Sequence, residues 1–249
     1  MLDRPGRDLE ARRLIACYDL YRRLPTYDYF NWLCHVRLLG ASEITIWSGG
    51  KLLMRKKWPR EETFRRLDNF MLPGPRLFGM PCRLDSVGDR EAGSHMWRDL
   101  WQAAQEKGCG IPRMKSVLPP RSHRFTVTLR DSLHKPERNS DRKTWTLFAR
   151  EIGALLIDDH RHQPLSLYER FAIYAGAQMN FGVVTGPLGM LYYSDVPFRL
   201  FLDPAINTID YARQGHGQVE RLPWFRNNQR FVWMKPTFPL LLQQSVDLL

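Results

Sequence analysis

The stretch MNFGVVTGPLGMLYYSDVPFRLFLD, residues 179–203, decides the fold class. Its first apolar run is typical of a buried strand and stops at Thr185-Gly186-Pro187, where a short helical pattern begins. A second apolar run, FRLFLD, then ends in an aspartate. A strand, a helical crossover and a second strand form a βαβ unit, in which the two strands are parallel. The stretch therefore predicts a parallel sheet. It leaves open whether the Thr-Gly-Pro turn only reverses the chain or also holds a phosphate.

The same alternation extends over the rest of the chain. Strand-like runs lie at residues 14–20, 42–47, 76–81, 124–130, 154–159, 178–184 and 198–203, and helical patterns lie at 26–40, 60–71, 92–108, 140–153, 166–177 and 237–249. Thr26 is the expected cap of the first helix, and Asn139 or Ser140 that of the fourth. Strands that alternate with helices predict a mostly parallel sheet covered on both faces.

A Pro-rich break, SVLPPRSH at 116–123, divides this pattern in two. We therefore predict an α/β fold of two Rossmann-like halves with mostly parallel sheets and a cleft between them. Residues 1–118 form the first half and residues 123–249 the second. Ligands of such sheets bind beyond the carboxyl ends of the strands, so residues that follow strands are the candidate site residues.

The charge balance points to anionic partners. Among 249 residues there are 37 lysines and arginines against 26 aspartates and glutamates, a formal net charge of +11. No RNA-recognition motif, zinc finger or basic zipper is present, so we expect no specific nucleic acid as partner. The densest basic run, RKKWPREETFRR at 55–66, is either a solvated surface or a peripheral contact with an anionic membrane surface or acceptor.

Other features argue against membrane insertion and against a metal site. No run approaches the ~18 apolar residues of a membrane span, and the charged start MLDRPGRDLEARR lacks the apolar segment of a signal peptide. We expect a cytoplasmic location. The four cysteines are widely spaced and form no CxxC pair, so they are expected to be reduced thiols. The DDHRH run at 158–162 is interpreted as a polar loop, because metal ligands usually come from several elements. Neither metal nor cofactor is expected.

Phosphate recognition is the chemistry that the strand ends favour most. Thr185 can cap the helix that begins at Gly186 and Pro187, and the N–H groups of Leu188 and Gly189 are then expected to face a phosphate. Arg130 ends another strand, and Arg138 precedes the next helix, so both are candidate diphosphate ligands. The alternatives are an ordinary helix start and surface salt bridges. The segment LPWFRNNQRFVWMK (222–235) either stacks a base or forms a partly buried brace, and we expect the brace.

Two segments, FTVTLRDSLHKPERNSDRKTWTLFAREIGALLIDD (125–159) and LSLYERFAIYAGAQMNFGVVTGPLGMLYYSDVPFRLFLD (165–203), resemble a known family. They are similar to the nucleotide-sugar-binding half of bacterial glycosyltransferase-like proteins of the GT-B architecture, within the fucosyltransferase-related branch. In that family a strand ending in Arg leads to a helix opening with Asn-Ser, and a small-residue turn lies under the donor diphosphate. Arg130, Asn139-Ser140 and Thr185-Gly186-Pro187 occupy those places, and PTYDYFNWL (25–33) resembles the family's start. The family's His-x-Arg-Arg signature is replaced by Thr128-Leu129-Arg130, which leaves the donor sugar and activity open.

The resemblance implies metal-independent transfer of a sugar from a nucleotide diphosphate sugar to the hydroxyl of a glycan or other acceptor, in glycan or cell-envelope polysaccharide synthesis. Arg130, Arg138 and the turn at Thr185, Gly186, Pro187 and Leu188 would hold the donor diphosphate. The general base is expected to come from the first half, with Asp19 as first candidate and Asp131 as second. The alternatives are an inactive protein that binds the sugar nucleotide, and a nucleic-acid-binding protein.

Overall fold

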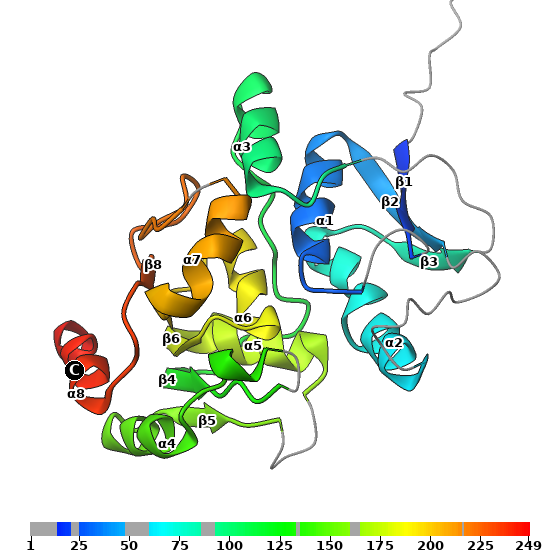
Figure 1. Cartoon of the computed structure of the whole chain (residues 1–249). Coiled ribbons are helices and arrows are strands. Elements are labelled where there is room, and N and C mark those ends of the chain that lie inside the picture. The colour runs from blue at the N-terminus through cyan, green and yellow to red at the C-terminus, as the bar shows by residue number, and fades with distance from the viewer. Residues whose placement is uncertain are drawn as a thin grey trace, which may run out of the picture.

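The computed structural model describes residues 14–20, 25–47, 60–85, 93–132, 135–159, 165–215 and 217–249. Two sheets and the helices around them form an α/β structure (Figure 1). Every pairing between the described strands is parallel. The predicted fold class, α/β with mostly parallel sheets, is thereby confirmed.

The first half is built on a three-stranded sheet in the order β1-β2-β3, formed by Leu14–Asp19, Ala41–Trp47 and Cys82–Asp85. Helix α1 (Tyr29–Leu38) joins β1 to β2 and completes the predicted βαβ unit. The other helical elements are α2 (Arg60–Arg66), the π-helix η1 (Leu67–Met71), the 3-10 helix η2 (Gly74–Phe78) and α3 (Trp97–Glu106).

The prediction of a strand at residues 76–81 is wrong. Residues 76–78 belong to η2, and Gly79 caps its end with a φ of +70°, a left-handed conformation that glycine adopts without strain. The chain turns there and enters the sheet only afterwards, as β3.

The second half contains a five-stranded sheet in the order β5-β4-β6-β7-β8. Its strands are β4 (His123–Thr128), β5 (Leu155–Ile157), β6 (Ala177–Val183), β7 (Phe198–Phe201) and β8 (Gln229–Val232). The chain passes from β4 to β5 on one side and then returns to β6 on the other. The strand order therefore reverses between β4 and β6, and the crevice beyond their carboxyl ends is where open parallel sheets bind ligands.

Helices cover both faces of this sheet. They are α4 (Arg142–Glu151), α5 (Leu167–Gly176), α6 (Gly186–Gly189), α7 (Pro204–Arg213) and α8 (Phe238–Gln243), with short 3-10 helices η3 (Pro136–Arg138), η4 (Met190–Tyr193) and η5 (Val246–Leu248). Side chains of α4 and α8 pack on one face with Phe125 and Phe181 of the sheet, and those of α5 and η4 pack on the other.

Two helix starts differ from expectation. Helix α4 is capped by Asp141, whose carboxylate accepts from the Lys143 N–H at 3.2 Å, and not by Asn139 or Ser140. Helix α1 follows Asp28 and not Thr26, and the Asp28 side chain makes no capping hydrogen bond. The first helix therefore begins with a carboxylate that is not engaged by the helix backbone.

Helix α7 and strand β8 were not predicted. The segment 222–235 contains β8, and its Trp224 is buried with the indole N–H donating to the Tyr192 carbonyl at 3.1 Å. The expectation of a partly buried brace is confirmed, because Trp224 and Phe231 are buried and Phe225 and Trp233 pack against the same core.

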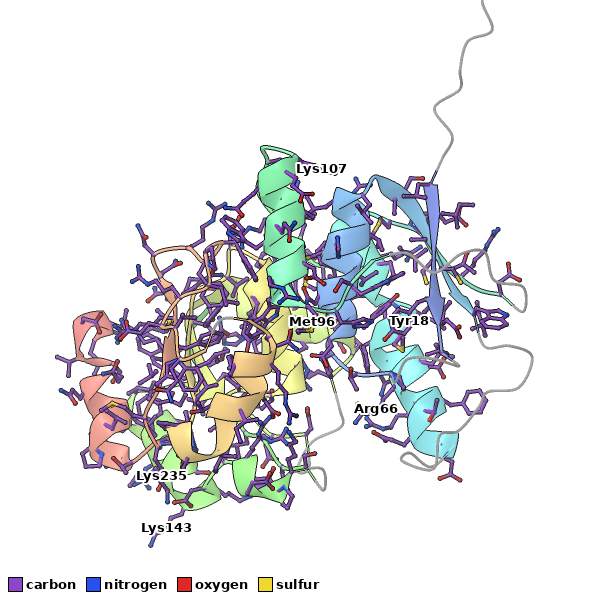
Figure 2. The ribbon with its side chains drawn as sticks, turned by 45° about the horizontal axis from the view of Figure 1, so that its top comes forward. Tyr18, Arg66, Met96, Lys107, Lys143 and Lys235 are labelled. Atoms are coloured by element: carbon purple, nitrogen blue, oxygen red, sulfur yellow. The ribbon has the colours of Figure 1, made fainter. Side chains whose placement is uncertain are left out.

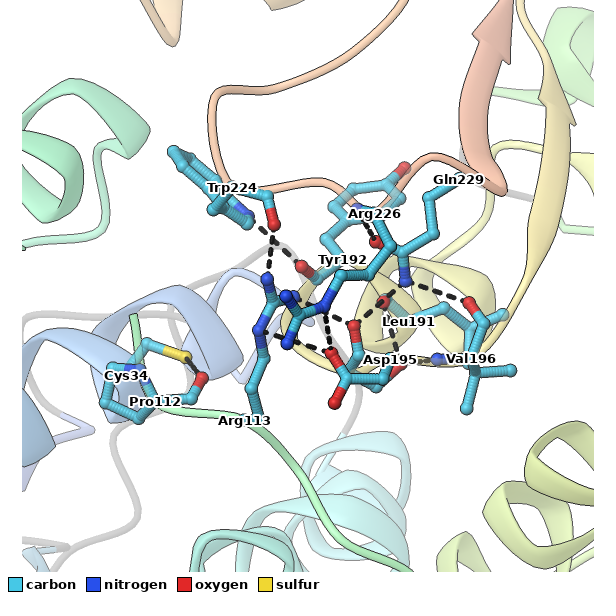
Figure 3. Close-up of polar contacts among 11 residues, drawn as sticks. Cys34, Pro112, Arg113, Leu191, Tyr192, Asp195, Val196, Trp224, Arg226 and Gln229 are labelled. Carbon is cyan, nitrogen blue, oxygen red and sulfur yellow. Dashed lines mark hydrogen bonds and ion pairs between the residues drawn. The ribbon is translucent and has the colours of Figure 1, made fainter. Parts of the chain in front are cut away.

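One apolar core joins the two halves. A single cluster of buried side chains includes Trp32 and Phe70 of the first half together with Tyr192 and Phe198 of the second. The segment between α3 and β4 ties them further: the Arg113 guanidinium donates to the carbonyls of Ser194 and Trp224 (Figure 3). The two sheets therefore have a fixed relation in the structure, with the cleft between them.

Candidate functional site

A cleft of about 610 Å³ lies between the two halves. It opens beyond the carboxyl ends of β4 and β6, at the point where the strand order of the second sheet reverses. Its described lining carries seven cationic side chains and four carboxylates: Arg65, Arg66, Arg130, Lys135, Arg138, Arg170 and Arg213, with Asp28, Asp131, Asp159 and Asp210. The excess of positive charge suits an anionic ligand.

Three of these cations gather around one carboxylate on the second-half wall of the cleft. Lys135 Nζ lies 2.5 Å from Asp210 Oδ2, and Arg138 donates to the same oxygen. Arg130 lies beside them, since its guanidinium donates to the Lys135 carbonyl at 3.3 Å. We call Arg130, Lys135 and Arg138 the cationic group. Lys135 and Arg138 share the Asp210 carboxylate, and the charge of Glu137 acts on Arg130.

The charges of the cationic group perturb one another. Burial lowers the pKa of the Arg130 guanidinium, and the neighbouring Arg138 lowers it further. Burial alone would raise the pKa of Asp210, but the hydrogen bond from Lys135 and the charge of Arg138 bring it below its usual range. Like charges held together at a partly buried place favour the binding of a further anion between them. The structure thus brings together Arg130 and Arg138, as the sequence predicted, and adds Lys135 and Asp210.

The turn Thr185-Gly186-Pro187 also lines the cleft, but its backbone does not offer the expected donors. The Leu188 N–H donates to the Thr185 hydroxyl at 3.3 Å, and the Gly189 N–H donates to the Thr185 carbonyl at 2.9 Å. Leu188 itself is fully buried and does not line the cleft. The expectation that these N–H groups face a phosphate is therefore wrong, because the helix start satisfies them internally.

Gly186 has a different role at this turn: it leaves room for a side chain from the first half. The ring of Tyr27, from the first half, lies directly over it, so that a Cβ at position 186 would lie 2.7 Å from Tyr27 Cε2. Tyr27 is in turn stacked on Phe70, with ring centroids 4.5 Å apart. The turn and Tyr27 therefore form one of the contacts between the two halves, within the lining of the cleft.

Tyr27 lies near an ion pair whose arginine is buried. Arg170 has a side chain that is 5% exposed and donates to Asp159, whose carboxylate reaches the cleft. Desolvation raises the pKa of Tyr27 to about 12, against the opposing effect of Arg170, so its hydroxyl stays protonated at neutral pH. Tyr27 can therefore donate a hydrogen bond but does not serve as a base.

The two carboxylates expected to act as general base are placed differently. Asp19, the first candidate, is 6% exposed at the end of β1 and does not line the cleft, so this expectation is not supported by the geometry. Asp131 does line the cleft and lies 3.4 Å from the Arg142 guanidinium. Its carboxylate is therefore engaged by an arginine of the second half.

Sequence reasoning missed Asp28, which lines the cleft from the first half. It precedes α1 in the connection that follows β1, so the rule that selected Asp19 applies equally to it. Asp28 is exposed to the cleft, yet the atoms of both halves surround it. This desolvation raises the pKa of Asp28, the hydroxyl of Thr26 lowers it, and the charge of Asp210 raises it further.

Other predicted features fall outside the cleft or outside the described residues. In the DDHRH run, Asp158 is buried and paired with Arg142, whereas residues 160–164 lie outside the described part. Of the basic run 55–66, residues 55–59 lie outside it too, and Arg66 faces the second half across the cleft (Figure 2). Among the described residues, no group of three or more potential ligands could hold a metal ion.

No described helix combines the length and the apolar character needed to cross a bilayer. No protein-family model, curated protein or solved structure gives a significant match to the chain. The geometry of the cleft is therefore the basis for the function proposed below.

Proposed function

We propose that the protein is a glycosyltransferase that binds a nucleotide diphosphate sugar in the cleft and transfers its sugar to an acceptor hydroxyl. The observation that carries this proposal is the cationic group at the carboxyl end of β4, beside the point where the strand order reverses. The acceptor is a glycan or another hydroxyl compound, and glycan or cell-envelope polysaccharide synthesis is the process that we propose for it.

The electrostatics of the cationic group support diphosphate binding. Guanidinium groups recognise phosphate oxygens through paired N–H donors, and a lysine ammonium adds a compact charge. When the bond from sugar to phosphate breaks, negative charge develops on the leaving diphosphate. Arg130, Lys135 and Arg138 would stabilise that charge without a metal ion, since the fold holds all three in the lining of the cleft.

The remainder of the lining supports a sugar nucleotide over inorganic phosphate. Tyr27 is half-buried and lines the same cleft, so its ring offers aromatic surface to the apolar face of a sugar ring. The cleft of about 610 Å³ is within the usual range for small-molecule sites.

Thermal unfolding in the presence of UDP-, GDP- and dTDP-sugars tests this proposal. A ligand present at about 100 times its Kd adds about 2.7 kcal/mol to the free energy of unfolding. For a chain of this size we expect the Tm to rise by roughly 5–10 °C with at least one of these compounds. Sulfate at matched ionic strength serves as the control, and release of the nucleoside diphosphate distinguishes turnover from binding alone.

The outcomes separate the candidate functions. Stabilisation by a sugar nucleotide without turnover favours the inactive binding protein. Stabilisation only by oligonucleotides, with steep salt dependence, contradicts the proposal and favours a nucleic-acid-binding protein.

A further inference from the structure

Asp28 differs from the other three carboxylates of the cleft. Asp131 pairs with Arg142, Asp159 with Arg170, and Asp210 with Lys135 and Arg138. Among the described residues, the side-chain contact of the Asp28 carboxylate is the Thr26 hydroxyl, which donates to Oδ2 at 3.3 Å. A carboxylate in a cleft with excess positive charge is thus kept apart from the described cations.

The backbone around Asp28 is firmly held. Its carbonyl oxygen accepts from the Asn31 N–H at 3.1 Å and lies 3.1 Å from His95 Nδ1. The Asn31 side-chain amide in turn donates to the His95 carbonyl, and Asn31 is 1% exposed. These bonds fix the start of α1, although the Asp28 side chain does not cap it. The carboxylate therefore projects into the cleft from a rigid support.

Asp28 also faces the place proposed for the diphosphate. Asp210, which lies within the cationic group, is close enough to raise the pKa of Asp28. Asp28 lines the cleft from the first half, and Arg130, Lys135 and Arg138 line the same cleft from the second. A sugar whose diphosphate rests on the cationic group would therefore have its anomeric carbon between that group and the first-half wall that carries Asp28.

We infer that Asp28 is the general base that removes the proton from the acceptor hydroxyl. This inference rests on the proposed function. The acceptor oxygen forms a bond to the anomeric carbon of the donor sugar as its proton passes to the Asp28 carboxylate. The bond from that carbon to the diphosphate oxygen breaks, and the nucleoside diphosphate leaves with the electron pair.

The surroundings of Asp28 fit this role. A base that accepts a proton is more effective when its pKa lies nearer the working pH, and desolvation raises the pKa of Asp28 in that direction. The groups that act on the carboxylate are the Thr26 hydroxyl from its own connection, Asp210 from α7, and the protonated hydroxyls of Tyr192 and Tyr193. His95, from the segment before α3, lies against the Asp28 backbone carbonyl.

The substitution Asp28→Asn tests the inference, with Asp68→Asn as control. Asp68 is an exposed carboxylate of the same half that does not line the cleft. Turnover is measured as nucleoside diphosphate released from whichever UDP-, GDP- or dTDP-sugar stabilises the wild type, with mixed sugar glycosides as acceptors. We expect Asp28→Asn to lower kcat by about 100- to 10,000-fold, as for loss of a general base, and Asp68→Asn to leave it unchanged.

Two further measurements separate a catalytic role from loss of structure. Removal of a negative charge from the cleft should lower the Kd for the nucleoside diphosphate, or leave it unchanged. Because the pKa of Asp28 is raised in the folded state, its ionised form opposes folding at neutral pH. Asp28→Asn should therefore raise the Tm at pH 7, and this gain should disappear as the pH falls through the folded pKa.

The outcomes distinguish the inference from the function on which it rests. If the wild type binds no sugar nucleotide or turns none over, the proposed function fails and the role of Asp28 is overturned with it. If the wild type is active and Asp28→Asn retains its kcat, only the role of Asp28 is overturned. If Asp131→Asn loses kcat while Asp28→Asn remains active, Asp131 is the general base instead.

Discussion

Replacement of Arg138 by alanine is expected to weaken the binding of a nucleoside diphosphate by roughly 10- to 150-fold. Arg138 is 17% exposed, lies beside Arg130, and has a buried Nε without a hydrogen-bond partner among the described residues. A hydrogen bond to a charged group contributes about 1.5–3 kcal/mol, which corresponds to that change in Kd. Isothermal titration with the diphosphate that stabilises the wild type would measure it.

Arg150→Ala is the matched control for this prediction. Arg150 is exposed in the last turn of α4 and does not line the cleft. Arg150→Ala should leave the Kd unchanged, and Arg130→Ala should weaken binding as Arg138→Ala does. Equal Kd values for Arg138→Ala and Arg150→Ala would show that Arg138 serves only to hold Asp210.

Substitution of Gly186 by alanine is expected to destabilise the protein by about 1–3 kcal/mol, which lowers the Tm by roughly 2–12 °C. The added Cβ would lie 2.8 Å from Tyr27 Cγ and still closer to the adjacent ring carbon. Tyr27 is stacked on Phe70 with an interplanar angle of 14°, so its ring has to move against a packed neighbour. Thermal unfolding followed by circular dichroism measures the loss.

Gly189→Ala provides the control in the same turn. A Cβ at Gly189 would have its nearest neighbour at 3.9 Å, an ordinary contact distance. This variant should be as stable as the wild type or slightly more stable, because alanine favours helix over glycine. If Gly186→Ala has the same Tm as Gly189→Ala, the contact between Tyr27 and the turn does not contribute to holding the two halves together. Recovery of stability in Gly186→Ala combined with Tyr27→Ala would confirm that contact.

The parallel sheets could be predicted because hydrophobic runs and helical patterns alternate clearly in the second half. The same alternation placed Arg130 and Thr185 at the ends of β4 and β6, and these strands prove to be direct neighbours. The carboxyl ends of parallel neighbours meet at one edge, so local sequence was sufficient to identify this side of the cleft.

Contacts between segments that are distant in the sequence could not be predicted from local sequence patterns. Asp210 comes from α7, whose polar pattern did not indicate a helix, and its partner Arg138 lies 72 residues earlier. The N–H groups at Leu188 and Gly189 were expected to be free, but the Thr185 hydroxyl and carbonyl accept from them. Asp28 was overlooked because Asp19 ends β1 whereas Asp28 lies farther along the connection, and only packing of the two halves decides which of them reaches the cleft.

A crystal structure of the protein with a bound nucleoside diphosphate is the most direct test of the central claim. We predict that the diphosphate oxygens lie within hydrogen-bond distance of the guanidinium groups of Arg130 and Arg138, in place of the Asp210 carboxylate or beside it. A diphosphate bound elsewhere, for example only on Arg65 and Arg66 of the opposite wall, with Arg138 still paired to Asp210, would contradict it.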